Sequence, residues 1–174
     1  GGKSGGLAWG PLARVAGWAV APERRTNRVA AKTDWSVFVE DNPTECWGVS
    51  TPKEMVNTRD GRVVAVNRGQ TLLMVFYRPS ADAKGQVAFT GGYPFASGST
   101  VTMDISGNSY ELFTEGEWAW PATTADDAKI IAAMKRGADA TLTGRSSRGT
   151  QTKDTFSLLG FTAAVEDAEK RCGG

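Results

Sequence analysis

The sequence predicts a mainly β protein, an antiparallel β-sandwich of jelly-roll-like form with one helix in its body and one C-terminal helix. Roughly ten short segments rich in strand-forming residues recur along the chain, and turn residues separate them about every eight to twelve positions. Two stretches instead have the apolar period of about 3.6 residues that marks a helix. Because helices and strands do not alternate, an antiparallel sandwich or a barrel-like sheet pair is favoured over βαβ units.

We interpret residues 1–34 as a leader. Their apolar part, Leu7–Ala21, is too short to span a bilayer and is interrupted by Arg14. It ends at residues 19–21 in the small-x-small pattern that precedes a secretory cleavage site. We therefore expect a signal-like or flexible leader over residues 1–34, with an alanine-rich segment of no signal function as the alternative. A single β-sandwich domain without a transmembrane span is expected over residues 35–172.

The first half of this domain has the pattern of hairpins. Trp35–Val39 and Glu45–Ser50 form a hairpin around a turn, and a polar connection over Lys53–Asp60 follows. Arg62–Asn67 then alternates as a strand does. Thr71–Tyr77 is apolar on both faces, which predicts a central strand covered on both sides. Further strands are expected at Gln86–Thr90, Ser99–Ile105, Ser109–Thr114 and Trp118–Trp120.

The body helix is expected to begin near Thr123 and Thr124. A threonine three residues before an aspartate resembles a capping box, and Gly137 marks the helix end. Two strands follow, at Asp139–Arg145 and Gln151–Leu159. At Gly160 the apolar period changes to that of the C-terminal helix, whose buried stripe is expected to comprise Phe161, Ala164, Val165, Ala168 and Cys172.

The chain has two cysteines, Cys46 in the first hairpin and Cys172 on the inward face of the last helix. In an oxidising compartment they form an even set, and each is the other's only intramolecular partner. We expect a disulfide that ties the last helix across the sheet. Two free, buried cysteines that pack as small apolar side chains are the alternative.

Composition excludes several classes of function. The chain has no histidine and two cysteines, so the usual zinc ligand sets and the Ser-His-Asp or Cys-His arrangements cannot be assembled. We expect no metal, no cofactor and no enzymatic activity. The net charge of +1 gives no electrostatic basis for binding nucleic acid, which needs clustered basic residues.

Three groups of residues are candidate surfaces. Aromatic residues in a glycine-rich loop and before Pro121 suit a platform for a sugar ring or a peptide, although core packing is the ordinary role of such residues; they are Tyr93, Phe95, Trp118 and Trp120. Acids on alternating strands suit a glycosidase pair, although a solvated face is their usual role; they are Asp104, Glu111, Glu115 and Glu117. Arg145, Arg148 and Lys153 suit an anion-binding rim, although surface charge is the default.

Residues Asp154–Ala164, with a helix behind them, resemble the C-terminal signature of the invasion-associated locus B (IalB) proteins. Three other features fit this family in the same order: Trp35–Val37 followed by Cys46, the strand at Leu72–Val75, and the helix end at Met134–Gly137. The resemblance covers residues 35–172. It implies an exported β-sandwich-type protein of Gram-negative bacteria, periplasmic, secreted or outer-membrane-associated, in a family linked in some pathogens to host-cell entry. It implies no enzymatic activity.

The chain also departs from the family pattern. Many members carry a cysteine in the first strand and a further pair before the body helix, whereas Val37–Val39 and Phe113–Pro121 contain none here. The chain therefore resembles a divergent branch that keeps one bridge, and a general envelope role is favoured over one in invasion.

The leading hypothesis is a non-catalytic envelope protein that acts through contacts with an envelope or host protein, which the sequence does not identify. A carbohydrate- or peptide-binding module is the alternative. A carboxylate-based hydrolase is a third hypothesis, and it predicts a concave acidic cleft.

Overall fold

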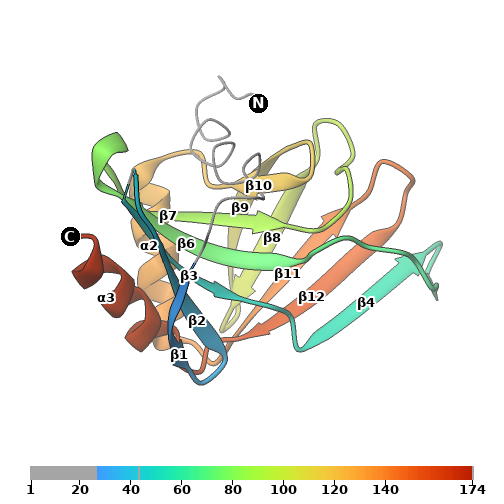
Figure 1. Cartoon of the computed structure of the whole chain (residues 1–174). Helices are drawn as coiled ribbons and strands as arrows, with labels where there is room; N and C mark the ends of the chain where they lie inside the picture. Colours follow the sequence, from blue (N-terminus) through green and yellow to red (C-terminus); the bar gives the residue numbers. More distant parts are fainter. Residues whose placement is uncertain (1–26, 43, 174) are drawn as a thin grey trace.

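The computed structural model describes residues 27–42 and 44–173 (Figure 1). Within these residues the strands are β1 (Asn27–Lys32), β2 (Trp35–Glu40), β3 (Glu45–Ser50), β4 (Glu54–Arg59), β5 (Arg62–Val63), β6 (Leu72–Arg78), β7 (Ala83–Thr90), β8 (Thr100–Ile105), β9 (Asn108–Glu115), β10 (Trp118–Trp120), β11 (Asp139–Arg145) and β12 (Gln151–Ser157). The helices are the short 3-10 helix η1 (Pro79–Ala81) and the α-helices α2 (Thr124–Arg136) and α3 (Phe161–Arg171).

All of these strands belong to one antiparallel sheet, in the order β1-β2-β3-β6-β7-β10-β9-β8-β11-β12-β4-β5. The sheet curls so that distant strands face each other. Phe89 of β7 and Phe156 of β12 have four strands between them in this order, yet their ring centroids are 6.0 Å apart. The mainly β class, the antiparallel pairing and the two α-helices are thus confirmed. The two layers expected of a sandwich are the halves of a single curved sheet.

The main core lies inside the curve of the sheet. Strand β8 alternates as the sequence predicted, with Val101, Met103 and Ile105 buried. Strand β6 is buried on both faces: Leu73 and Val75 join the main core, whereas Met74 and its even-numbered neighbours join a second apolar cluster that includes Trp47 and Trp120. The central position predicted for β6 is therefore confirmed.

Both α-helices pack on the same side of the sheet, as Figure 1 shows. Helix α2 begins as expected, because the Thr123 hydroxyl accepts a hydrogen bond from the Asp126 N–H at 3.1 Å. Helix α3 follows Gly160, whose φ is +89°; a Cβ there would lie 1.7 Å from the Lys32 carbonyl oxygen, so only glycine fits. No helix in the described part of the chain is long and apolar enough to cross a bilayer.

The structure contains the disulfide that the sequence predicts. Cys46 of β3 and Cys172 at the end of α3 are bonded, with their Cα atoms 6.0 Å apart across a sequence separation of 126 residues. At the other end of α3, Trp35 and Phe161 pack edge to face, with ring centroids 4.9 Å apart. The buried stripe of α3 has the predicted members, since Phe161, Ala164, Val165, Ala168 and Cys172 are all buried.

Three local expectations were wrong. Residues 27–32, assigned to the leader, form β1 and pair with β2, so the folded region begins before Trp35; the signal-like segment lies outside the described residues. The polar connection expected over Lys53–Asp60 contains β4, which pairs with the free edge of β12. Backbone pairing stabilises this strand without an apolar side-chain pattern. The strand expected over residues 62–67 ends at Val63, because no strand in the described part of the chain pairs with the residues after it.

Candidate functional site

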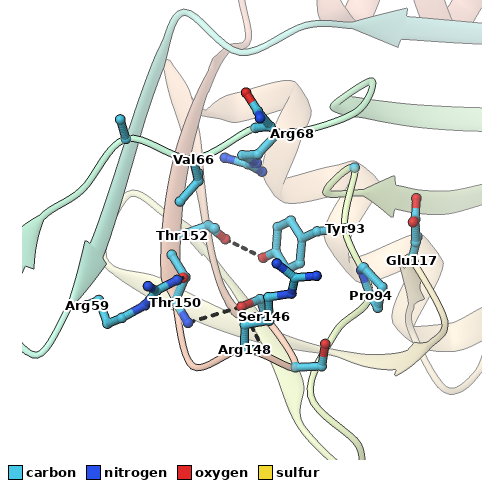
Figure 2. Close-up of a pocket in the computed structure, with 14 residues that line it drawn as sticks. Arg59, Val66, Arg68, Tyr93, Pro94, Glu117, Ser146, Arg148, Thr150 and Thr152 are labelled. Atoms are coloured by element: carbon cyan, nitrogen blue, oxygen red, sulfur yellow. Dashed lines mark hydrogen bonds between the residues drawn. The ribbon is translucent and has the colours of Figure 1, made fainter.

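A cleft of about 560 Å³ lies where strand ends and loops meet at the β4 side of the sheet (Figure 2). Its walls come from the end of β4, residues 65–68, residues 92–94 and the turn between β11 and β12. Figure 2 shows Val66 and Arg68 along one side, and Ser146, Arg148 and Thr150 along the other. The volume falls within the range of pockets that bind small ligands.

Arg68, which lines the cleft, forms a buried ion pair with Asp154, and we call this pair the floor of the cleft. The two guanidinium Nη atoms each donate to one carboxylate oxygen, and both distances are 2.7 Å. The side chains are 5% and 0% exposed. Arg68 also donates from Nε and Nη2 to the Gly91 carbonyl and from Nη1 to Asn57 Oδ1. An arginine has five N–H donors, so this set of bonds uses all of them and makes Arg68 a structural residue.

Tyr93 packs against the Arg68 side of this ion pair. The Arg68 guanidinium carbon lies 5.1 Å from the centroid of the Tyr93 ring, a cation–π contact. The phenol oxygen is hydrogen-bonded to the Thr152 hydroxyl, and the ring packs against Phe95 with centroids 4.9 Å apart. Burial raises the pKa of Tyr93 to about 12, so its hydroxyl stays neutral at physiological pH.

A close backbone approach joins the loops that hold Arg68 and Tyr93. The Gly69 N–H donates to the Gly92 carbonyl at 2.8 Å. Gly92 has a φ of +79°, and a Cβ at this position would lie 2.5 Å from the Gly69 carbonyl oxygen. Any larger residue at position 92 would therefore separate the two loops and displace the floor of the cleft.

The rim of the cleft carries two exposed arginines, Arg59 and Arg148. Arg59 Nη2 donates to the Thr150 hydroxyl at 2.7 Å, and neither arginine forms an ion pair with a carboxylate of the described residues. The turn that carries Arg148 is fixed by the Ser146 hydroxyl, which accepts from the N–H groups of Arg148 and Thr150. The rim is thus cationic and its main chain is held in place.

The aromatic residues singled out in the sequence do not form one exposed surface. Tyr93 lines the cleft but is 8% exposed, and Phe95 is buried behind it in the main core. Trp120 is buried in the second apolar cluster, and Trp118 packs against that cluster. Core packing, the ordinary role of such residues, therefore describes their positions.

The charged candidates are distributed unevenly. Asp104, Glu111, Glu115 and Glu117 are all exposed, and only Glu117 reaches the cleft. The concave acidic cleft that a hydrolase would need is thus not formed by these four acids. In the expected basic rim Arg148 lines the cleft, whereas Arg145 and Lys153 are exposed outside its lining. Across the described residues no group of three or more histidine, cysteine or acidic side chains is placed to hold a metal ion.

Sequence reasoning missed Arg59, Arg68 and Asp154. A signal for Asp154 was present, because this residue shares the inward face of β12 with Thr152 and Phe156. A carboxylate on the apolar face of a strand predicts a buried cationic partner. The identity of that partner depends on the loop path and cannot be deduced from alternation.

Comparisons with known proteins agree with this architecture. The family model of the invasion associated locus B (IalB) protein matches residues 35–169. The fold is similar to the crystal structure of invasion associated protein B from Bartonella henselae, with a TM-score of 0.57 and 15% sequence identity over 86% of this chain and 99% of that chain. At this identity the likeness shows the fold alone. A search of curated proteins found no match to the sequence.

Proposed function

The chain belongs to the invasion associated locus B family, and from this premise we propose that it is an exported, non-catalytic protein of the cell envelope that acts by binding other proteins. The disulfide supports an extracytoplasmic location, since disulfides persist in oxidising compartments. The periplasm or the outer membrane is the proposed site. A general envelope role is preferred to one in host-cell entry, because the chain lacks the further cysteines expected of many family members.

The observation that carries the binding role is the build of the cleft. Its floor is fully hydrogen-bonded and buried, while its rim presents arginines without a carboxylate partner among the described residues. A rigid floor under a polar, accessible rim is the arrangement that positions a bound partner. Among the described residues, its lining has no histidine or cysteine and a single carboxylate, Glu117, so it favours binding over acid–base or nucleophilic chemistry.

Cell fractionation and a thiol assay test export. The full chain, expressed in a Gram-negative host, is expected in the periplasmic or outer-membrane fraction, with neither Cys46 nor Cys172 alkylated before reduction. A cytoplasmic protein with both thiols alkylated would contradict the proposal. For the binding role, crosslinking in intact cells is expected to capture an envelope protein, and the variant Arg148→Ala is expected to weaken that capture more than Lys153→Ala does.

A carbohydrate ligand is the second candidate, and one observation favours it. Hydroxyl groups of Ser146, Ser147 and Thr150 lie along one wall of the cleft. Against it, the Tyr93 ring has Arg68 on one face and Phe95 at its side, so it offers little surface for stacking on a sugar. If one of the variants Arg148→Ala and Trp118→Ala reduces binding to a glycan array and the other does not, the comparison shows which of the two residues lies at the ligand. An array on which the protein binds no glycan would exclude a carbohydrate ligand.

A further inference from the structure

Residues 64–70 follow β5 outside any strand, and none of the strands in residues 27–42 and 44–173 pairs with them. The Val64 N–H donates to the Asn57 carbonyl at 2.9 Å, and Gly69 N–H donates to Gly92. Between these two bonds, residues 65–68 make no backbone hydrogen bond with any other described residue. The segment nevertheless keeps a strand's alternation, with Val64, Val66 and Arg68 partly buried and the residues between them exposed.

This segment forms one wall of the cleft, and the arginine rim faces it (Figure 2). Arg59 adds positive charge beside Thr150, to whose hydroxyl it donates, and its cross-strand neighbour in the short β4–β5 pairing is Arg62. Arg148 adds positive charge from the turn between β11 and β12. Glu117 is the one carboxylate among the described lining residues, so the local balance favours an anion.

From these two observations we infer that the cleft binds an extended acidic segment of a partner protein. The segment pairs through its main chain with residues 65–67 as an added strand, and a glutamate or aspartate side chain is bound by Arg148 and Arg59. Strand addition takes its affinity from main-chain hydrogen bonds and its specificity from alternate side chains. Arginine suits the second part because its guanidinium binds a carboxylate in a bidentate manner.

The same observations favour a protein over a phosphorylated lipid or an acidic polysaccharide. All three ligands carry anions, but only a polypeptide has main-chain N–H and C=O groups that match an unpaired extended segment. Arg68 adds no net charge to the cleft, because the Asp154 carboxylate neutralises its guanidinium group. All of its N–H donors are already used, so its role is structural. The discriminating groups are therefore the two rim arginines and the backbone of residues 65–67. This inference rests on the proposed binding role, because it names the kind of partner that the cleft takes.

Immobilised peptide libraries test it on the full chain. Three octapeptide libraries share random outer positions: one has a central Glu-Glu pair, one has Gln-Gln, and one has Glu-Glu with N-methylation at alternate residues. Wild-type protein is expected to be retained about tenfold more strongly by the first library than by the second, as one charge-assisted contact predicts. N-methylation is expected to remove the retention, because it blocks strand pairing.

Matched variants assign the binding to the cleft. Arg59→Ala and Arg148→Ala are each expected to lower retention by the Glu-Glu library about tenfold. Lys153→Ala removes the same charge from the same sheet outside the cleft and is expected to change little. Equal retention of the Glu-Glu and Gln-Gln libraries, equal retention of the methylated library, or normal binding by both arginine variants would overturn the inference.

A further arm separates this inference from the proposed function. Suppose that the protein binds vesicles of anionic phospholipid, loses this binding in the variant Arg148→Ala, and is retained by none of the peptide libraries. That result would overturn the inference and identify the ligand as a phosphate group instead of a protein segment. Envelope localisation together with partner capture that does not depend on Arg59 or Arg148 would overturn the inference and leave the envelope role standing. Cytoplasmic localisation would overturn the envelope role itself.

Discussion

The curled sheet is held closed in two places by different chemistry. We call the first the helix closure, which comprises the Cys46–Cys172 bond and the packed rings of Trp35 and Phe161. We call the second the cleft floor, which comprises the Arg68–Asp154 pair, Tyr93 and the Gly91 carbonyl. The helix closure is covalent and apolar, whereas the cleft floor depends on hydrogen bonds that must all be made.

Both closures join residues far apart in the chain, at separations of 126 and 86 residues. An apolar closure gains stability from burial in almost any packing arrangement. A buried ion pair gains little over an apolar pair of the same shape and loses much when one partner is missing, but it fixes geometry. The difference indicates that the helix closure supplies stability, and that the cleft floor supplies a defined shape beneath the exposed arginines.

Removal of the disulfide should have the largest effect on stability. The double variant Cys46→Ala/Cys172→Ala is expected to lose up to about 5 kcal/mol of unfolding free energy, because the bond closes a long loop in the unfolded chain. Urea unfolding of the variant, and of wild type with and without reductant, measures this loss. A loss below about 1 kcal/mol would show that the packing of α3, and not the bond, holds the helix closure.

Breaking the ion pair should be the next largest effect. Asp154→Ala is expected to cost about 3–5 kcal/mol, because Arg68 would remain buried with an uncompensated charge. The double variant Arg68→Met/Asp154→Leu serves as the control, and most of the stability is expected to return while peptide retention by the cleft does not. If the single variant unfolds no more easily than the double variant, the cleft floor is not a closed polar network.

Tyrosine titration should give a smaller effect that compares the two regions directly. Burial raises the pKa of Tyr93 to about 12, and burial with the nearby charges of Glu169 and Glu166 raises the pKa of Tyr77, beside α3, to about 12. The usual value is about 10, so the unfolded chain loses these protons first. The stability from each raised pKa is present below about pH 10 and is lost as pH rises through 12, up to about 3 kcal/mol each.

The measurement is the unfolding free energy between about pH 9 and pH 11 for wild type, Tyr93→Phe and Tyr77→Phe. Each variant is expected to show a shallower decline than wild type, because phenylalanine has no proton to lose. The Tyr77 variant tests the α3 side and the Tyr93 variant tests the cleft floor. A decline as steep as that of wild type in either variant would mean that its hydroxyl is as hydrated in the folded protein as in the unfolded chain.

The helix closure was predictable from the sequence, and the cleft was not. The stripe from Phe161 to Cys172 is a local pattern, and local periodicity fixes which face of a helix is buried. Asp154 could be recognised as anomalous, but its partner Arg68 lies in a loop whose path is set by the Gly69–Gly92 contact. The alternation after Val63 correctly marked inward side chains and wrongly implied a neighbouring strand, because periodicity records burial and not pairing.

The smallest effect is expected at the rim. Arg148→Ala should change the unfolding free energy by less than about 0.5 kcal/mol, because the side chain is exposed and makes no ion pair with the described carboxylates. Its backbone remains held by Ser146, so the turn should keep its form. Thermal unfolding of this variant and of Lys153→Ala measures the change in stability of each relative to wild type.

A loss of unfolding free energy above about 1 kcal/mol in Arg148→Ala would show that Arg148 supports the fold. Wild-type stability with weakened ligand retention would instead separate the two roles: the floor maintains the shape of the cleft, and the rim arginines bind what enters it.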